Sequence, residues 1–267
     1  MPSPLELLLD PVSLVFFGMF AALALAEALF PARPLPAVPG WRARGLVSFA
    51  VYFFLSSYLP LGWTAALVRY QLVDLTGLGT WLGAGAGLLV YEAGAYAWHR
   101  SMHASGLLWR TFHQMHHSAE RLDTFGAFWF SLPDMVGWTA LFSLCLTLVV
   151  GLTPEATTVT LLVVSFCGIF QHANLRTPRW LGYVIQRPES HSAHHERGVH
   201  ARNYADLPLF DLLFGTFHNP ADFAREQGFY NGASSRVVEM ACLRDVSQPP
   251  PAVAKAAGAL GRRSARA

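Results

Sequence analysis

The sequence carries little charge. Asp, Glu, Lys and Arg make up 13% of its 267 residues, whereas hydrophobic residues make up 53%. An average soluble domain has about 25% charged residues. The formal net charge of +2 is also too small to indicate a nucleic-acid partner. The composition therefore argues against an ordinary soluble domain and predicts a protein that lies largely in a membrane.

Cysteine and lysine are also scarce. Cys145, Cys167 and Cys242 form no C-x-x-C pair, and we expect all three to be reduced and structural. Lysine occurs once, at Lys255, beside 18 arginines, a bias that suggests a GC-rich bacterial genome. No basic region precedes the first apolar stretch, so we expect no cleavable signal peptide.

Long apolar stretches are abundant instead. Five of them cover residues 11–30, 45–67, 81–97, 133–152 and 157–170. A helix that crosses the hydrocarbon layer needs about 20 apolar residues. The first, second and fourth stretches are long enough, and the third and fifth are short but end near histidines. We therefore predict an all-α integral membrane helical bundle with about four to five transmembrane helices.

The basic residues predict an orientation. If all five stretches cross the membrane, segments 31–44, 98–132 and 171–267 share one side and hold 18 of the 19 Lys and Arg residues. Only Arg69 lies on the other side. Basic residues concentrate in cytoplasmic loops. We therefore expect a protein of the bacterial inner membrane whose histidine-rich segments and C-terminus face the cytoplasm.

Histidine is the residue that the sequence places most unevenly. The pattern H-x-x-H-H occurs twice, as HQMHH and HSAHH, and an H-x-x-x-H precedes the first copy. Neutral imidazole is a good ligand for iron, zinc and copper, and residues three or four apart share one face of a helix. Nine histidines exceed the three or four protein ligands of a single zinc, so their number predicts two metal ions. These nine are His99, His103, His113, His116, His117, His172, His191, His194 and His195.

Other polar residues are candidates for supporting roles. Glu92 and Tyr96 precede His99 on nearly the same helix face and could accept a hydrogen bond from a metal-bound imidazole. Glu92 could equally lie near a water-filled cavity or pair with an arginine. His200 is a possible ligand or supporting residue, whereas His218 is typical of an ordinary surface histidine.

Less specific interpretations compete with the metal centre. One H-x-x-H-H alone could belong to a polar surface helix, but its repetition makes that explanation weak. A metal transporter would place its ligands near the bilayer midplane, whereas these histidines lie at the ends of the apolar stretches. A zinc hydrolase would need fewer ligands.

Residues 84–218 resemble the fatty acid hydroxylase/sterol desaturase superfamily of integral-membrane di-iron proteins. The resemblance rests on Glu92 and Tyr96 before H-R-x-x-H, on both H-x-x-H-H motifs, on H-A-N at 172–174, and on a closing N-Y … D-x-x-F-G-T. It implies that the nine histidines bind the metals, and that Asn203 and Asp211 of the closing motif are possible ligands or supporting residues. Ala205 stands where the family commonly has glycine, and it would be strained if that position needs a positive φ.

The resemblance also implies the reaction. It implies O2-dependent hydroxylation of an unactivated C–H bond of a lipid by two iron ions, with desaturation on the same site as the alternative. A non-redox metal-binding or metal-transport protein is a remote alternative. No fused electron carrier is evident. We therefore expect a separate ferredoxin- or cytochrome b5-like donor with an NAD(P)H reductase.

The sequence suggests three regions. We expect N-terminal transmembrane helices over 1–83, a catalytic domain over 84–218 with a cytoplasmic helical cap that carries the histidines, and a C-terminal segment over 219–267 that is disordered from about 247. The aromatic run 125–130 and Trp138 could line a lipid tunnel, but simple packing is the preferred interpretation.

Overall fold

The protein is described by a computed structural model over residues 1–250, and its regular secondary structure there is helical except for two strands of two residues each. The predicted disorder from about residue 247 falls mainly on residues 251–267, which lie outside the described residues. The elements in chain order are α1 (Pro4–Leu9), α2 (Pro11–Leu29), α3 (Trp41–Arg69), β1 (Val73–Asp74), η1 (Thr76–Leu78), α4 (Gly79–Ala104), α5 (Gly106–Leu108), η2 (Trp109–His113), α6 (Gln114–His117), η3 (Thr124–Gly126), α7 (Leu132–Ser143), η4 (Leu144–Val149), β2 (Val150–Gly151), α8 (Pro154–Phe170), η5 (Arg179–Tyr183), α9 (Pro188–His194), α10 (Leu209–Leu213), η6 (Ala233–Ser235) and α11 (Val237–Ala241).

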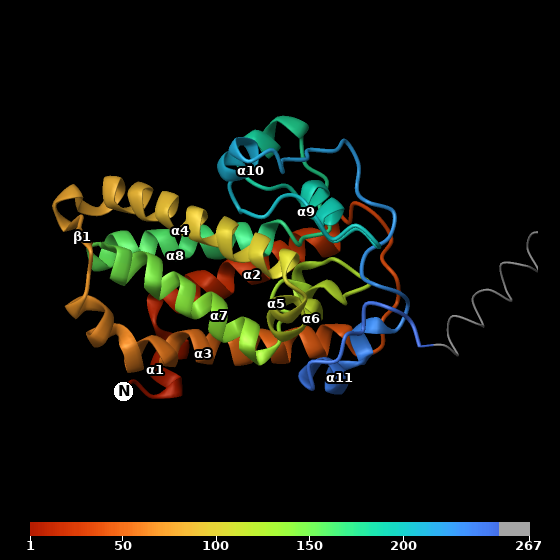
Figure 1. Ribbon diagram of the computed structural model, residues 1–267, viewed down its shortest axis with the longest axis horizontal. Helices are drawn as coiled ribbons and strands as arrows, with labels where there is room; N and C mark the ends of the chain where they lie inside the picture. The colour runs from red at the N-terminus through yellow and green to blue at the C-terminus, as the bar shows by residue number, and fades with distance from the viewer. Residues whose placement is uncertain (251–267) are drawn as a thin grey trace, which may run out of the picture.

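Five long helical segments form a bundle along the long axis of the molecule (Figure 1). They are α2, α3, α4, α7 with its continuation η4, and α8, and each covers all or most of one of the five predicted apolar stretches. The closest helix pairs are α4 with α8, α3 with α7, and α2 with α8. The predicted all-α membrane bundle is therefore confirmed.

Three of the bundle helices begin with the same N-capping arrangement. Asp10, Ser131 and Thr153 each cap a helix by accepting a hydrogen bond from a backbone N–H of its first turn, and a proline stands at the first or second helical position. A side-chain oxygen at the cap satisfies a backbone N–H that has no partner within the helix, and proline loses no hydrogen bond there.

The long helices turn their apolar side chains outward. Within residues 1–250, three helices are long and apolar enough to cross a membrane, namely Pro11–Leu29, Trp41–Arg69 and Leu132–Val149. Only 6%, 17% and 33% of the residues in their most apolar windows are buried inside the protein. By length and hydropathy, three helices of residues 1–250 qualify as membrane spans, fewer than the expected four to five. The helix α8 has only 17 residues, and α4 carries glycines and polar residues along its 26.

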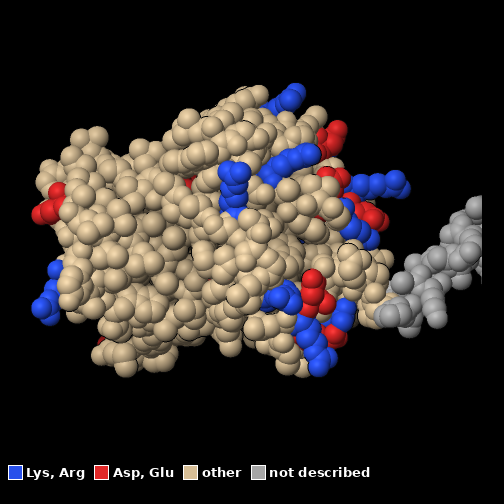
Figure 2. Space-filling model, in the orientation of Figure 1, with Lys and Arg blue, Asp and Glu red and all other residues tan. Residues whose placement is uncertain are grey.

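The two ends of the bundle differ. At one end, β1 pairs in parallel with β2, so the α3–α4 and α7–α8 connections lie together. At the other end, α5, α6, α9, α10 and α11 form a cap (Figure 1). Figure 2 shows that most of the visible charged side chains gather at the cap end, while the bundle is largely free of charge. The histidine motifs all belong to the cap end.

Both terminal segments hold the cap in place. The Glu27 carboxylate of α2 accepts hydrogen bonds from the Thr124 N–H, the Thr124 hydroxyl and the Asn174 N–H at 2.9–3.0 Å. At the other end of the chain, Met240 and Val246 are buried beside the first H-x-x-H-H. The N-terminal helices and the C-terminal segment are therefore part of the structure that positions the histidines.

Candidate metal centre

The nine histidines predicted as ligands converge in two buried groups. In each group the ligand nitrogens all lie within 4.8 Å of one another. All nine side chains are buried except His103, which is half-buried. The first group is His99, His103, His113, His117 and His194, and the second is His116, His172, His191 and His195.

Each H-x-x-H-H motif contributes to both groups. The residues four apart stay together, as in His113 with His117 and His191 with His195, and the remaining histidine joins the other group. Residues four apart are separated by about 40° around a helix, whereas adjacent residues are separated by about 100°. The spacing therefore divides each motif between two centres, rather than aiming it at one point.

Local backbone geometry supports the first motif. Residues 109–113 form a turn of π-helix immediately before the α-helical residues 114–117. A π-turn inserts an extra residue into the helical repeat and changes the direction of the following side chains, and such turns are frequent at functional sites.

Five imidazoles are oriented through Nδ1. His99 and His194 donate to the carbonyls of Tyr204 and Arg202 at 2.8 and 2.6 Å, and His172 donates to the Gly168 carbonyl at 2.7 Å. The remaining two pairs are His113 with the Asp134 carboxylate at 3.3 Å and His191 with the Gln186 side-chain oxygen at 3.0 Å. Because each partner is an acceptor, Nδ1 must carry the proton, and Nε2 of each neutral ring is a lone pair.

Several of these lone pairs face one another. His99 Nε2 lies 2.9 Å from His113 Nε2 in the first group, and His172 Nε2 lies 3.0 Å from His191 Nε2 in the second. Two lone pairs at such distances repel each other unless a shared cation lies between them. This arrangement is the one expected around a metal ion whose imidazole ligands are held by their second nitrogen.

Buried imidazole nitrogens without hydrogen-bond partners also indicate a site for metal ions. Nε2 of His103, His117 and His194 is buried and has no hydrogen-bond partner among residues 1–250. Each such group costs about 1–3 kcal/mol if it stays unpaired. The donor set therefore fits two metal ions, with five histidines available to one and four to the other.

The histidines are electrically neutral. Burial, with the neighbouring imidazoles, lowers the pKa of His113, His117 and His195 well below its usual value. Burial lowers the pKa of His172 to about 4. Neutral rings can bind a cation without first losing a proton.

Within residues 1–250, neither Glu92 nor Tyr96 forms a hydrogen bond with a histidine. Glu92 accepts a hydrogen bond from the Leu207 N–H at 3.0 Å. The Tyr96 hydroxyl lies 2.8 Å from an Arg100 nitrogen and 3.2 Å from the Thr216 hydroxyl. Both side chains therefore fasten α4 to the closing motif, rather than orient an imidazole directly.

Asn203 and Asp211 also act on the backbone. The Asn203 side chain donates to the Ser190 and His218 carbonyls, at 3.1 and 2.8 Å. Asp211 accepts from the N–H groups of Tyr204 and Ala205 at 2.9 and 3.0 Å. These bonds hold the Tyr204 carbonyl against His99 and place Asn203 and Asp211 in supporting positions.

The strain considered for Ala205 is absent. Arg202 and Asn203 are the residues of this turn with positive φ, at 74° and 51°, and Ala205 is not among them. Asparagine tolerates this conformation better than most residues. An alanine therefore fits at position 205.

His200 and His218 lie outside the two groups. His200 Nδ1 is 3.1 Å from His117 Nδ1, so this residue supports a member of the first group. His218 is half-buried, and its backbone pairs with Asn203.

Sequence reasoning missed Asp134 and Gln186. Asp134 is completely buried in the first turn of α7, and an acid within an apolar stretch is a sequence signal of a functional site. Gln186 gave no such signal. Its amide donates to the carbonyls of Asn203 and Ala205, which turns its oxygen toward His191.

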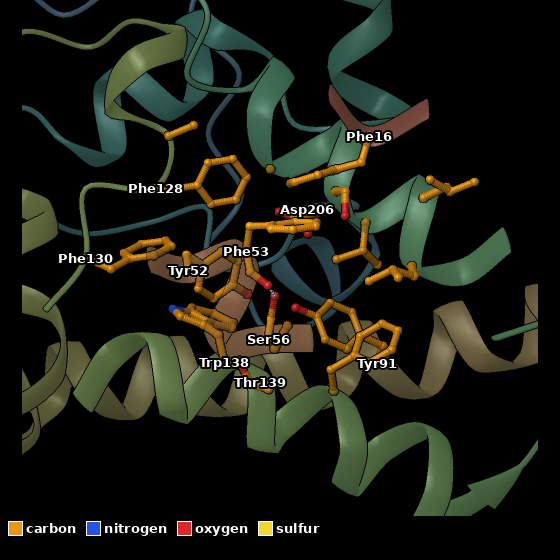
Figure 3. A pocket seen from close by; sticks show the side chains of 18 of the residues that line it. Phe16, Tyr52, Phe53, Ser56, Tyr91, Phe128, Phe130, Trp138, Thr139 and Asp206 are labelled. Atoms are coloured by element: carbon orange, nitrogen blue, oxygen red, sulfur yellow. Dashed lines mark hydrogen bonds between the residues drawn. The ribbon is translucent and has the colours of Figure 1, made fainter. Parts of the chain in front are cut away.

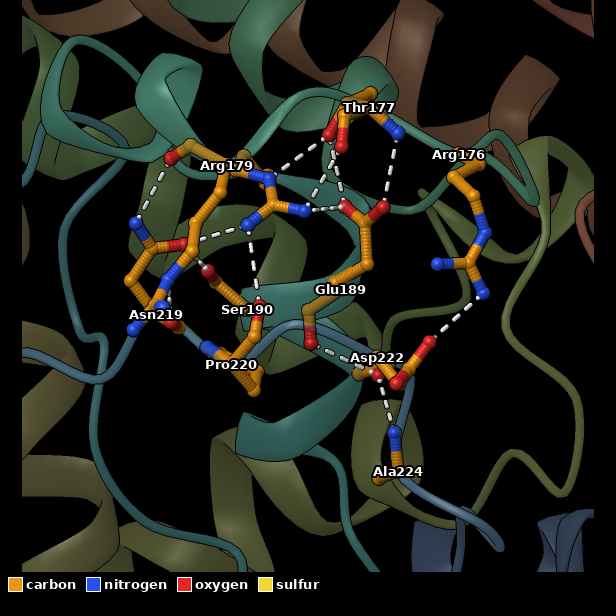
Figure 4. A network of polar contacts seen from close by, with 11 residues as sticks. Arg176, Thr177, Arg179, Glu189, Ser190, Asn219, Pro220, Asp222 and Ala224 are labelled. Carbon is orange, nitrogen blue, oxygen red and sulfur yellow. Dashed lines mark hydrogen bonds and ion pairs between the residues drawn. The ribbon is translucent and has the colours of Figure 1, made fainter.

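A buried polar network anchors α9, which carries the second H-x-x-H-H (Figure 4). The Arg187 guanidinium, 1% exposed, pairs with the Glu189 carboxylate at 3.0 Å and donates to Thr177 and Asn219. Glu189 also accepts from the Thr177 N–H and hydroxyl at 2.8 Å. The start of α9 is thereby fixed to the segment that follows His172.

A cavity of about 520 Å³ extends from the histidines into the bundle (Figure 3). Its walls include members of both histidine groups and, on α3, Tyr52, Ser56, Pro60 and Thr64. Twelve residues of helix correspond to about 18 Å, more than half the ~30 Å hydrocarbon thickness of a bilayer. A long, narrow and mostly apolar ligand suits this space.

Aromatic side chains contribute to the cavity wall. Phe128, Phe130 and Trp138 line it, whereas Phe125 packs in the core and does not. Packing, the preferred interpretation of these aromatics, is therefore incomplete, because three of them also bound the cavity.

Together, the fold and the site define a helical membrane protein in which two buried histidine groups, each able to hold a metal ion, lie at one end of a long cavity. Comparison with known proteins shows the family to which such a protein belongs. Residues 84–216 match the family described as fatty acid hydroxylase. The chain is 34% identical over 139 residues to the ornithine lipid hydroxylase OlsE of Rhizobium tropici, and the match covers 50% of this chain and 41% of that relative. The chain thus spans less than half the length of this curated relative. No solved structure matches. The chain belongs to the fatty acid hydroxylase superfamily.

Proposed function

We propose that this protein is a membrane-bound non-haem di-iron oxygenase that hydroxylates an unactivated C–H bond of a membrane lipid, using O2 and external electrons. The observation that carries the proposal is the pairing of imidazole lone pairs at about 3 Å at the end of a lipid-sized cavity. Membership of a hydroxylase family supports the same reaction class.

The number of ligands favours iron over zinc. Five histidines are available to one metal and four to the other, whereas a zinc usually takes three or four protein ligands. Two iron ions held by such ligands supply O2 activation and an oxidant for the C–H bond.

The chain itself contributes orientation and exclusion of water. Asp134, Gln186 and three backbone carbonyls hold the rings with Nε2 toward the metals. The cavity aligns a lipid chain along α3, with the reacting carbon at the histidine end. Positioning of this kind supplies much of the rate in a reaction whose oxidant belongs to the cofactor.

The lipid is supplied by the membrane and the electrons by another protein. We propose that the cap faces the cytoplasm of a bacterium, across its inner membrane, because basic residues follow this side of the chain. A ferredoxin- or cytochrome b5-like protein with an NAD(P)H reductase would then deliver electrons there. The relative that acts on ornithine lipid supports an amino-acid-containing lipid as the substrate.

The test is isotopic. Cells expressing the wild type or His116→Ala would be grown under ¹⁸O2, and their lipids compared by mass spectrometry. A lipid that appears only with the wild type and carries one ¹⁸O atom is the expected result. A lipid that has lost two hydrogens and gained no label would make the protein a desaturase, and identical lipid profiles at equal expression in the native host would contradict the proposal.

A further inference from the structure

A carboxylate lies in the wall of the cavity close to the second histidine group. Asp206 is half-buried and lines the cavity together with Gln171, which directly precedes His172 (Figure 3). Asp206 Oδ1 accepts a hydrogen bond from the Gln171 amide nitrogen at 2.8 Å.

This pair presents two acceptor oxygens that have no partner among the described residues. The Gln171 amide nitrogen is engaged by Asp206, so its oxygen is left over, and this oxygen is buried without a partner among the described residues. Asp206 Oδ2 makes no hydrogen bond within residues 1–250. A buried amide oxygen and a carboxylate oxygen in one wall suit a ligand that donates hydrogen bonds.

The charge of this wall is also uncompensated. The Glu92 carboxylate lies behind Asp206, where it accepts from the neighbouring Leu207 N–H, and its second oxygen has no partner among the described residues. Neither carboxylate forms an ion pair with a described Arg or Lys. Burial raises the pKa of Asp206 to about 6, and an ammonium group bound beside it would favour the anion. Acids beside an apolar cavity are costly, and such acids mark functional sites.

We propose that Asp206, with the Gln171 side-chain oxygen, binds a primary ammonium group of the lipid substrate. An ammonium group offers three N–H donors and a positive charge. The donors suit the Gln171 and Asp206 oxygens, and the positive charge suits the Asp206 carboxylate. This inference rests on the proposed function, and it makes the substrate class an amine-bearing lipid. Because Gln171 adjoins His172, the ammonium lies close to the metals, and the carbon that reacts belongs to the amine-bearing end of the lipid.

Ligand binding can be tested without turnover. The full-length, metal-loaded protein would be titrated in detergent with hexadecylamine, hexadecanol and hexadecanoate, which share one chain length, and the complexes counted by native mass spectrometry. We expect the wild type to bind the amine about 10- to 100-fold more tightly than the alcohol, and the carboxylate most weakly. In Asp206→Asn the three affinities should become nearly equal.

The variants separate charge from folding. Asparagine at position 206 can still accept from Gln171, so Asp206→Asn should keep the wild-type unfolding temperature, and Asp206→Glu should restore the preference for the amine. Asp222→Asn is the matched control, because Asp222 is an exposed aspartate that pairs with Arg176 on the cap. Equal binding of amine and alcohol by the wild type, or an unchanged preference in Asp206→Asn, would overturn the inference.

The ligand-binding test and the isotopic test can fail independently of each other. An amine preference that depends on Asp206, in a protein that incorporates no ¹⁸O, would keep the ammonium site and remove the oxygenase. Incorporation of ¹⁸O into a lipid without an amine would do the reverse.

Discussion

Replacing Gln186 by methionine should weaken one metal site and leave the other intact. Gln186 is the only side chain that accepts from His191 Nδ1 among the described residues, and His191 belongs to the second group. Methionine has a similar length but no amide. The variant therefore leaves the His191 N–H without its acceptor and leaves the carbonyls of Asn203 and Ala205 without their donor.

The expected loss of metal affinity follows from the role of the residues that accept hydrogen bonds from metal-bound histidines. Loss of a hydrogen bond to a metal-bound histidine typically lowers metal affinity about 10- to 100-fold. This corresponds to about 1.4–2.7 kcal/mol of binding free energy. The loss should fall on the ion of the second group, because none of the described residues of the first group contacts Gln186 by a hydrogen bond.

The assay is competition with a chelator. Purified protein would be dialysed against increasing chelator, and bound iron measured by mass spectrometry of the element. We expect the wild type to lose two ions at high chelator, and Gln186→Met to lose one of them at about 10- to 100-fold lower chelator. Gln227→Met is the matched control, because Gln227 is a buried glutamine whose side chain bonds Ala224 and Arg33 and no described histidine. Equal loss curves for Gln186→Met and wild type would refute this account of Gln186.

Three further changes test the anchor, the cavity and the cap. Arg187→Met leaves a buried carboxylate unpaired and should lower the free energy of unfolding by about 3–5 kcal/mol, measured by thermal or chemical unfolding, whereas the exposed Arg176→Met should change it by less than about 1 kcal/mol. Ser56→Phe should fill the cavity, keep both metals and lower turnover of a long-chain lipid by roughly tenfold or more, and unchanged turnover would show that the chain lies elsewhere. Gly228→Ala should destabilise the cap by about 1–3 kcal/mol, because Gly228 has a φ of +74° and an added Cβ would lie 2.8 Å from the Ala119 carbonyl oxygen; an unchanged unfolding temperature would contradict this.

The sequence contained enough to predict the helices and the set of converging histidines. Apolar length and proline-assisted caps mark helices locally, and the repeated H-x-x-H-H is a local pattern. The partition into groups of five and four was also latent in the spacing, since residues four apart share a face and adjacent residues do not.

What the sequence could not supply depends on contacts between distant segments. Gln186 reaches His191 only because its amide is held by two carbonyls of residues 203 and 205. The proposed ammonium site needs both Asp206 and Gln171, which are 35 positions apart in the sequence and joined by a hydrogen bond. Glutamine and aspartate have no periodicity that reports such a contact, so only the folded chain reveals these roles.

The cavity has a consequence for how proteins of this kind diversify. The family match begins at residue 84, and all nine histidines lie within it. Yet one side of the cavity is built by α2 and α3, through residues such as Phe16, Tyr52 and Ser56, which precede the match. Part of the cavity that would receive the lipid chain is thus encoded outside the stretch that carries the histidines. Exchange of the first two bundle helices between relatives, with Glu27 retained to hold the cap, would be a route to new lipid specificities that leaves the catalytic machinery untouched.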